Sequence, residues 1–171
     1  MRKVKALFVV VGIALAALGV VQARQTPGRG PATLTGVDYA EIQRIYARYA
    51  QGYDLCAEQG MAWARVFTPD GVFVAGGRVI EGRQKLAEFA KCPDGVARRP
   101  TQHWMSNPLI TPSAEGATGS AYVMQVNTID PKLSTSGGRY EDVFVKGPEG
   151  WAIKKRTYIP PTRPAAATPP E

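Results

Sequence analysis

The stretch GRYEDVFVKGPEGWAIKKRTYI, residues 138–159, decides the fold class of this chain. It contains two runs rich in β-branched and aromatic residues, Gly138–Lys146 and Trp151–Ile159, which the turn signal GPEG separates. Such a pattern predicts two neighbouring antiparallel strands. Two similar runs precede it, at Thr101–Thr111 and Ala117–Ile129, with PSAEG and DPKLSTSGG as turns. We therefore expect four consecutive antiparallel strands in the C-terminal half.

Helical patterns occupy the half of the domain before these strands. Apolar residues recur at helical spacing from Ile42 to Tyr53, and Asp38 followed by Glu41 predicts an N-terminal capping box. Two shorter helices and two short strands are also expected, at Met61–Phe67, Gly82–Cys92, Val72–Ala75 and Arg78–Ile80. Helices followed by a run of antiparallel strands indicate one α+β domain, spanning residues 37–159.

Residues 1–23 have the composition of a secretory signal peptide. Three basic residues precede an apolar run, and VQA provides a small-residue cleavage site after Ala23. We expect a periplasmic or secreted mature protein without stable membrane association, and an uncleaved N-terminal anchor is the alternative. Flanking the domain, a flexible leader is expected at residues 24–36 and a disordered Pro-rich tail at residues 160–171.

The charge of the chain does not point to nucleic acid. Cleavage would remove three of the 21 basic residues and none of the 14 acidic ones, so the formal net charge falls from +7 to +4. The one dense basic run, Lys154–Arg156, alternates between the two faces of a predicted strand and forms no stripe. With a single histidine and no CxxC motif, the sequence predicts no metal centre, and we expect no cofactor.

Two cysteines, Cys56 and Cys92, each follow the end of a predicted helix. In an oxidising compartment they are expected to form a disulfide, which would stabilise the fold by about 3–4 kcal/mol in the chain-entropy model. The alternative is two separate small core residues.

Several motifs occur in a distinctive order over Val37–Ile159, among them FTPDGVF, GRQKLAEF, HWMSNPLI and GRYEDVFVK. In this order the chain resembles the SnoaL-like branch of the NTF2-like superfamily. The resemblance implies a cone, in which a strongly curved mixed or antiparallel sheet wraps around about three helices and encloses a deep pocket. Relatives include scytalone dehydratase, ketosteroid isomerase, polyketide cyclases and non-catalytic modules, so the fold implies a pocket rather than one reaction.

The same resemblance implies catalytic roles for three residues. Tyr53 and Asp54 match a Tyr–Asp pair near the end of the first helix in dehydratase-like relatives, and His103 matches their acid–base histidine. A second histidine, common on the next strand of these relatives, is absent here. Gln125 or Asn127 is expected on the equivalent wall, where an amide donates hydrogen bonds but cannot relay protons at neutral pH.

Two catalytic roles for Asp54 remain open. It either orients His103, whose ordinary pKa near 6.5 suits proton transfer, or acts as the base itself. In the second case, burial and the negative end of the helix would raise the pKa of the carboxyl. A solvated helix end is the non-catalytic interpretation.

Further pocket residues follow from side-chain spacing. Strand alternation places Asn107 and Leu109 on the same face as His103. Tyr49 and Tyr140 are expected to polarise a carbonyl or phenolic oxygen of a substrate, although a tyrosine stripe is more often core packing.

Three hypotheses result. The first is an exported, cofactor-independent lyase (dehydratase) or isomerase acting on a small apolar ring or polyketide-like molecule. The second is a non-catalytic module that binds such a molecule or forms a homodimer through its sheet, and the third is a structural partner in a periplasmic assembly. The enzyme requires Asp54 and His103 to lie within reach of each other on the pocket wall.

Overall fold

The computed structural model describes residues 33–129 and 136–162. The predicted signal peptide (1–23), most of the leader and the tail beyond Thr162 lie outside the described residues. In chain order the elements are α1 (Gly36–Asp54), the 3-10 turn η1 (Ala57–Gly60), α2 (Met61–Ala64), β1 (Phe67–Ala75), β2 (Arg78–Glu81), α3 (Arg83–Ala90), β3 (Thr101–Ser113), β4 (Gly116–Asn127), β5 (Ser136–Gly147) and β6 (Gly150–Ile159).

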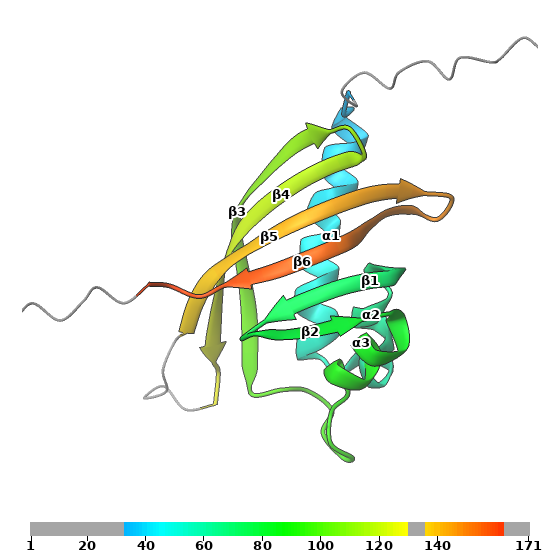
Figure 1. The fold of residues 1–171 in the computed structure, drawn as a ribbon. Coiled ribbons are helices and arrows are strands. Elements are labelled where there is room, and N and C mark those ends of the chain that lie inside the picture. The colour runs from blue at the N-terminus through cyan, green and yellow to red at the C-terminus, as the bar shows by residue number, and fades with distance from the viewer. Residues whose placement is uncertain (1–32, 130–135, 163–171) are drawn as a thin grey trace, which may run out of the picture.

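The six strands form one mixed sheet in the order β2-β1-β6-β5-β4-β3. All neighbouring strands are antiparallel except β1 and β6, which are parallel. The sheet is strongly curved, with α1 packed against β3 and β6, while α2 and α3 lie beside β1 and β2 (Figure 1). The sheet remains open at β2 and β3. This is the α+β cone that the sequence predicted.

The core fills the space between the sheet and the helices. One face of α1 is buried against it, and Trp63 of α2 is fully buried among the rings of Tyr49, Phe67 and Phe73. Each such aromatic pair contributes about 0.5–1.5 kcal/mol beyond its buried area. None of the helices in the described ranges is both long and apolar enough to span a membrane.

The start of α1 differs from the prediction. Thr35, rather than Asp38, is the N-cap: its side chain accepts from the Asp38 N–H at 3.2 Å, and the Asp38 carboxylate accepts from the Thr35 N–H at 2.8 Å. The capping box is therefore one turn earlier than Asp38–Glu41. Asp38 holds the third helical position because it also accepts from Lys146 Nζ and Trp151 Nε1, both at 2.8 Å. The β5–β6 hairpin thus anchors the helix start.

The second helix is shorter, and the first strand longer, than predicted. α2 ends at Ala64 and β1 already begins at Phe67, so FTPDG lies within the strand. The register with β6 shifts between Phe67 and Val72, an irregularity that accommodates Pro69, which has no N–H for the ladder.

A disulfide joins Cys56 and Cys92, whose Cα atoms are 5.6 Å apart. It closes a loop with a sequence separation of 36 residues and connects the chain after α1 to the chain after α3. Because Asp54 is the last residue of α1, this bridge fixes the helix end at which the predicted catalytic residues stand.

Candidate active site

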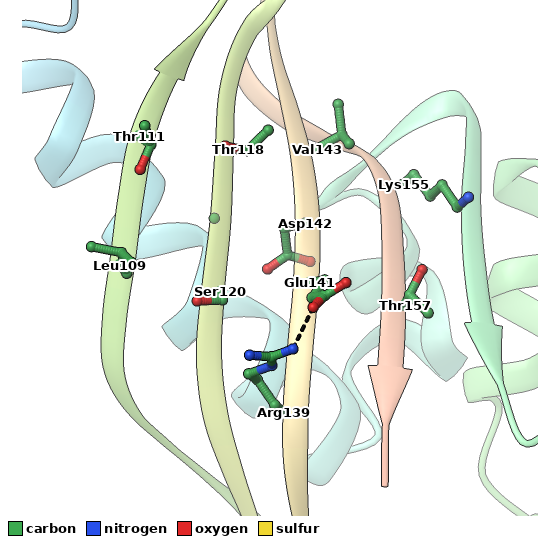
Figure 2. A pocket seen from close by; sticks show the side chains of 11 residues that line it. Leu109, Thr111, Thr118, Ser120, Arg139, Glu141, Asp142, Val143, Lys155 and Thr157 are labelled. Atoms are coloured by element: carbon green, nitrogen blue, oxygen red, sulfur yellow. Dashed lines mark hydrogen bonds and ion pairs between the residues drawn. The ribbon is translucent and has the colours of Figure 1, made fainter.

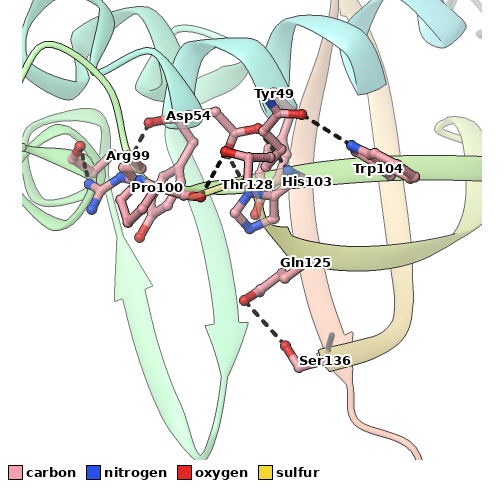
Figure 3. A network of polar contacts seen from close by, with 12 residues as sticks. Tyr49, Asp54, Arg99, Pro100, His103, Trp104, Gln125, Thr128 and Ser136 are labelled. Carbon is pink, nitrogen blue, oxygen red and sulfur yellow. Dashed lines mark hydrogen bonds and ion pairs between the residues drawn. The ribbon is translucent and has the colours of Figure 1, made fainter. Parts of the chain in front are cut away.

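Asp54 and His103 meet where the end of α1 passes the start of β3 (Figure 3). His103 Nδ1 lies 2.6 Å from Asp54 Oδ1, and the His103 backbone N–H donates to Oδ2 at 2.7 Å. The His103 side chain is 8% exposed and the Asp54 side chain is 11% exposed. Both carboxylate oxygens are thus held by His103, which explains how an anion is tolerated at the negative end of a helix.

Arg99, just before β3, holds the end of α1 in place through hydrogen bonds. Its backbone N–H donates to the Asp54 carbonyl at 2.7 Å, and its guanidinium donates to the carbonyl oxygens of Tyr53, Ala90 and Lys91 at 2.9–3.2 Å. It thereby satisfies carbonyls at the ends of α1 and α3. The guanidinium also lies 4.0 Å from the centroid of the Tyr53 ring. Arg99 positions Tyr53 and Asp54, a role that the sequence did not reveal.

His103 also faces a cavity of about 290 Å³ inside the cone. Half of its lining residues are tyrosine or phenylalanine, and the lining consists of Tyr49, Tyr53, Phe73, Ala75, Gly76, Arg78, Ile80, Phe89, His103, Gln125, Tyr140 and Tyr158. Because Nδ1 is engaged by Asp54, Nε2 is the ring nitrogen left for a ligand, and it has no hydrogen-bond partner among residues 33–129 and 136–162. The Tyr53 ring packs edge-on against the imidazole at 5.2 Å.

Asp54 does not line this cavity. It borders a separate, larger cleft of about 820 Å³ between α1 and β3, which His103 also lines. With both oxygens occupied by His103, the carboxylate is arranged to orient the imidazole rather than to reach a molecule in the aromatic cavity. In the described part of the chain, no three His, Cys, Asp or Glu side chains gather as they would to hold a metal ion.

Tyr49 and Tyr140 form a hydrogen-bonded pair on the cavity wall. The Tyr49 hydroxyl donates to the Tyr140 hydroxyl at 3.2 Å, which leaves the Tyr140 proton for another acceptor. Burial raises the pKa of both hydroxyls, so both remain neutral donors at physiological pH. Tyr49 and Tyr140 therefore both line the cavity, where they were expected from the sequence.

A buried ion pair lies behind the tyrosines. Arg156 donates to both oxygens of Asp142, at 2.6 and 2.8 Å, and both side chains are fully buried. The guanidinium carbon is 4.1 Å from the centroid of the Tyr49 ring and 4.5 Å from that of Tyr140. Burial acts to lower the pKa of Arg156, but the charge and hydrogen bonds of Asp142 outweigh it and raise this pKa.

The amide residues predicted for the wall occupy different positions. Gln125 is paired with His103 in the β3–β4 register and lines the cavity, where its Oε1 accepts from Ser136 Oγ at 3.4 Å. Asn127 lies at the end of β4, and its Oδ1 accepts from the Ile129 N–H at 3.0 Å, outside the cavity lining. Of the two amides, Gln125 is therefore the one that lies on the cavity wall.

A bulge in β3 moves Asn107 away from the cavity. Its φ is +51°, and the register with β4 shifts at this point. Asn tolerates this left-handed conformation, and the following Pro108 has no N–H to continue the ladder. The alternation reverses here: Ile110 packs against the core, whereas Leu109 is 65% exposed. The predicted inward positions of Asn107 and Leu109 are thus wrong.

The outer face of the sheet has a different character from the cavity. A hollow of about 440 Å³ crosses β3 to β6 there, and Figure 2 shows mostly hydroxyl and charged side chains around it. Arg139 and Glu141 form an exposed ion pair within this hollow. None of its lining residues is a histidine.

Residues 37–157 match the family model of the SnoaL-like domain. The chain belongs to the SnoaL-like domain family. None of the curated proteins matches it. Among solved structures, this SnoaL-like protein is similar to an Asp-to-Asn variant of a Mycobacterium tuberculosis protein of unknown function, with 26% identity over 78% of this chain and 82% of that chain and a TM-score of 0.67.

Two further structures share the fold of this SnoaL-like protein. A Nostoc punctiforme protein of unknown function with a cystatin-like fold is 24% identical over 78% of this chain and 98% of that chain, with a TM-score of 0.64. A candidate scytalone dehydratase from Novosphingobium aromaticivorans is 22% identical over 74% of this chain and 85% of that chain, with a TM-score of 0.61. These similarities establish the NTF2-like architecture.

Proposed function

We propose that this SnoaL-like protein is an exported, cofactor-independent lyase (dehydratase) or isomerase. Its substrate would be a small, largely apolar cyclic or polyketide-like molecule that enters the aromatic cavity. The observation that carries the proposal is the 2.6 Å contact between Asp54 and His103, the residue that lines that cavity. A cavity near 300 Å³ is at the small end of ligand sites and suits one or two rings.

The pair is arranged for general acid–base catalysis. Asp54 accepts from the protonated Nδ1, so the neutral imidazole of His103 carries its lone pair on Nε2. Nε2 then takes a proton from a carbon next to a substrate carbonyl, and Asp54 stabilises the imidazolium that forms. The Tyr140 hydroxyl donates to the carbonyl oxygen as it gains negative charge.

One base must perform both proton transfers. Gln125, opposite His103, cannot carry a proton at neutral pH. The imidazolium of His103 therefore returns its proton, either to a leaving hydroxyl group, which departs as water, or to another carbon of the same molecule. The first outcome is dehydration and the second is isomerisation.

The Cys56–Cys92 bridge supports the proposed export, because structural disulfides persist in oxidising compartments and are rare in the cytosol. The signal peptide itself remains a prediction. Mass spectrometry of protein recovered from the periplasm or medium tests it: we expect a mature chain beginning at Arg24, and an intact N-terminus at Met1 would contradict cleavage.

The catalytic proposal is tested with the mature chain in heavy water. Cyclic ketones carrying a β-hydroxyl group or a β,γ double bond are incubated with wild type, His103→Gln and Asp54→Asn, and NMR follows deuterium uptake and loss of water. Gln102→Ala, the exposed neighbour on β3, is the matched control. We expect turnover in wild type and control that is about 10²–10⁴-fold slower in the two variants. Ligand binding without any turnover would favour the non-catalytic module.

A homodimer is a second proposal, on a separate observation. Trp104, Tyr122 and Met124 are 46–57% exposed and adjoin one another on the outer face of β3 and β4. Exposed apolar patches of this kind often mark interaction sites. Analytical ultracentrifugation of wild type and Tyr122→Lys tests it: the variant should be monomeric and wild type dimeric, and a monomeric wild type would refute it.

A further inference from the structure

The short β1–β2 hairpin departs from the usual side-chain pattern of a sheet at two neighbouring residues, Arg78 and Val79. Phe73 pairs with Ile80 and Ala75 with Arg78, and all four residues line the cavity. Val79, between Arg78 and Ile80, faces away from the cavity and is 66% exposed. A sheet with one solvated face normally places apolar residues inward and polar residues outward. Here an arginine holds the inward position, and a valine holds the outward one.

Arg78 is also the one permanently charged side chain among the described residues that line the cavity. Within residues 33–129 and 136–162 its guanidinium has no hydrogen-bond or ion-pair partner, since the ion pairs there involve other residues. It lies 5.7 Å from the centroid of the Phe89 ring, which belongs to the same wall. A cation–π contact of this kind holds the group in place and leaves its N–H donors unused.

The tip of the hairpin keeps the surroundings of Arg78 open. Gly76 and Gly77 form the turn with φ of +56° and +75°, a conformation that glycine adopts without strain. A Cβ atom on either glycine would meet nothing within 4 Å. Gly76 lines the cavity and Arg78 is exposed, so the guanidinium stands where the cavity opens to solvent.

We propose that Arg78 binds a carboxylate on the substrate, which makes the substrate class a cyclic or aromatic acid. The planar guanidinium pairs with a carboxylate through parallel hydrogen bonds. The ring of the acid would lie between the anion site and the Tyr49–Tyr140 pair, with its reacting carbon beside His103. This inference rests on the proposed function only in taking the cavity as the substrate site.

The test compares two probes of the same shape, 2-naphthoate and neutral 2-naphthamide, by calorimetric titration of the mature chain. The variants are Arg78→Gln, Arg78→Lys and, as the matched control, Arg48→Gln, which removes the same charge from an exposed position of α1 outside the cavity lining. Wild type should bind the acid about tenfold more tightly than the amide, as expected for a charge-assisted pair. High salt should reduce this preference.

Arg78→Gln should weaken naphthoate binding about tenfold while leaving naphthamide unchanged, Arg78→Lys should keep part of the preference, and Arg48→Gln should behave as wild type. Equal affinities for the two probes in wild type, a preference that survives in Arg78→Gln, or no binding of either probe at millimolar concentration would each overturn the anion site. If His103→Gln turns over as fast as wild type while the preference for the acid is intact, the result would count against the proposed reaction alone.

Discussion

Two carboxylates in this domain each contact a basic side chain, and the two pairs differ in what they leave accessible. Asp54–His103 and Asp142–Arg156 both include a contact of 2.6 Å, and both are largely or wholly buried. His103 keeps one ring nitrogen for an aromatic cavity, whereas the guanidinium of Arg156 is enclosed by three tyrosine rings. One pair therefore leaves a ring nitrogen that a ligand can reach, whereas the other supports a cavity wall.

The largest effect that separates the two pairs is expected at His103. If the two pairs have different roles, His103→Gln should slow turnover about 10²–10⁴-fold while unfolding close to the wild-type urea midpoint. Side-chain amides retain hydrogen bonding to Asp54 but cannot move a proton. A variant that keeps its activity, or that unfolds as readily as an Arg156 variant, would show that the Asp54–His103 pair is structural.

Arg156→Met should give the opposite result. It leaves Asp142 buried without its partner, so the free energy of unfolding should fall by about 3–5 kcal/mol in urea titrations monitored by tryptophan fluorescence. Pairing it with Asp142→Leu should recover much of the loss. Arg139→Met, which breaks the exposed pair with Glu141, is the control and should change stability by less than about 1 kcal/mol. A similar loss in both single variants would contradict a special role for the buried pair.

The Cys56–Cys92 disulfide distinguishes the two pairs further, because it lies next to Asp54–His103 and not next to Asp142–Arg156. Replacing Cys56 and Cys92 together by serine should lower the free energy of unfolding by about 3–4 kcal/mol. It should also weaken catalysis, since the end of α1 carries Asp54. Thiol titration of denatured, unreduced wild-type protein should find no free thiol, and detection of free cysteines would contradict the bridge.

The smallest effect is expected at Asp38, a buried carboxylate near the start of α1 whose ion-pair partner Lys146 is exposed. The hydrogen bond from Lys146, with further ones from Thr35 and Trp151, holds the pKa of Asp38 below its ordinary value. A depressed pKa in the folded state contributes stability above the unfolded-state value of about 3.9, and that contribution is lost as the pH falls below it. The stability difference between wild type and Asp38→Asn should therefore shrink below about pH 4.

Glu115→Gln is the control for this titration, because Glu115 is exposed and has no ion-pair partner among the described residues. It should show no such pH-dependent difference. A stability difference for Asp38→Asn that stays constant from neutral to acidic pH would contradict the assignment.

Local patterns were sufficient for most element types and for the α+β class, because helical and alternating periodicities can be read from consecutive residues, whereas the cone came from the family resemblance. They failed where two patterns compete: Thr35–Asp38 and Asp38–Glu41 both fit a capping box, and only the contacts of Asp38 with the β5–β6 hairpin decide between them. Alternation along β3 failed at Asn107, because one bulge reverses every side chain beyond it.

The candidate site divides in the same way. The Asp54–His103 pair was predictable from the family resemblance, which supplies long-range information that spacing lacks. The Asp142–Arg156 pair depends on the exact register of β5 and β6, which two runs of alternating residues do not determine. The inward position of Arg78 runs against its polarity, so a pattern based on hydrophobicity assigns it to the surface.

The central claim is that Asp54 fixes the tautomer of His103 and leaves Nε2 for the cavity. Nitrogen-15 NMR of tag-free, histidine-labelled mature protein tests it directly, because the chain has a single histidine. At neutral pH we expect a protonated Nδ1 and an unprotonated Nε2 whose signal shifts when 2-naphthoate binds, with the tautomer preference weakened in Asp54→Asn. A protonated Nε2, or a signal indifferent to both the ligand and the Asp54 substitution, would contradict the claim.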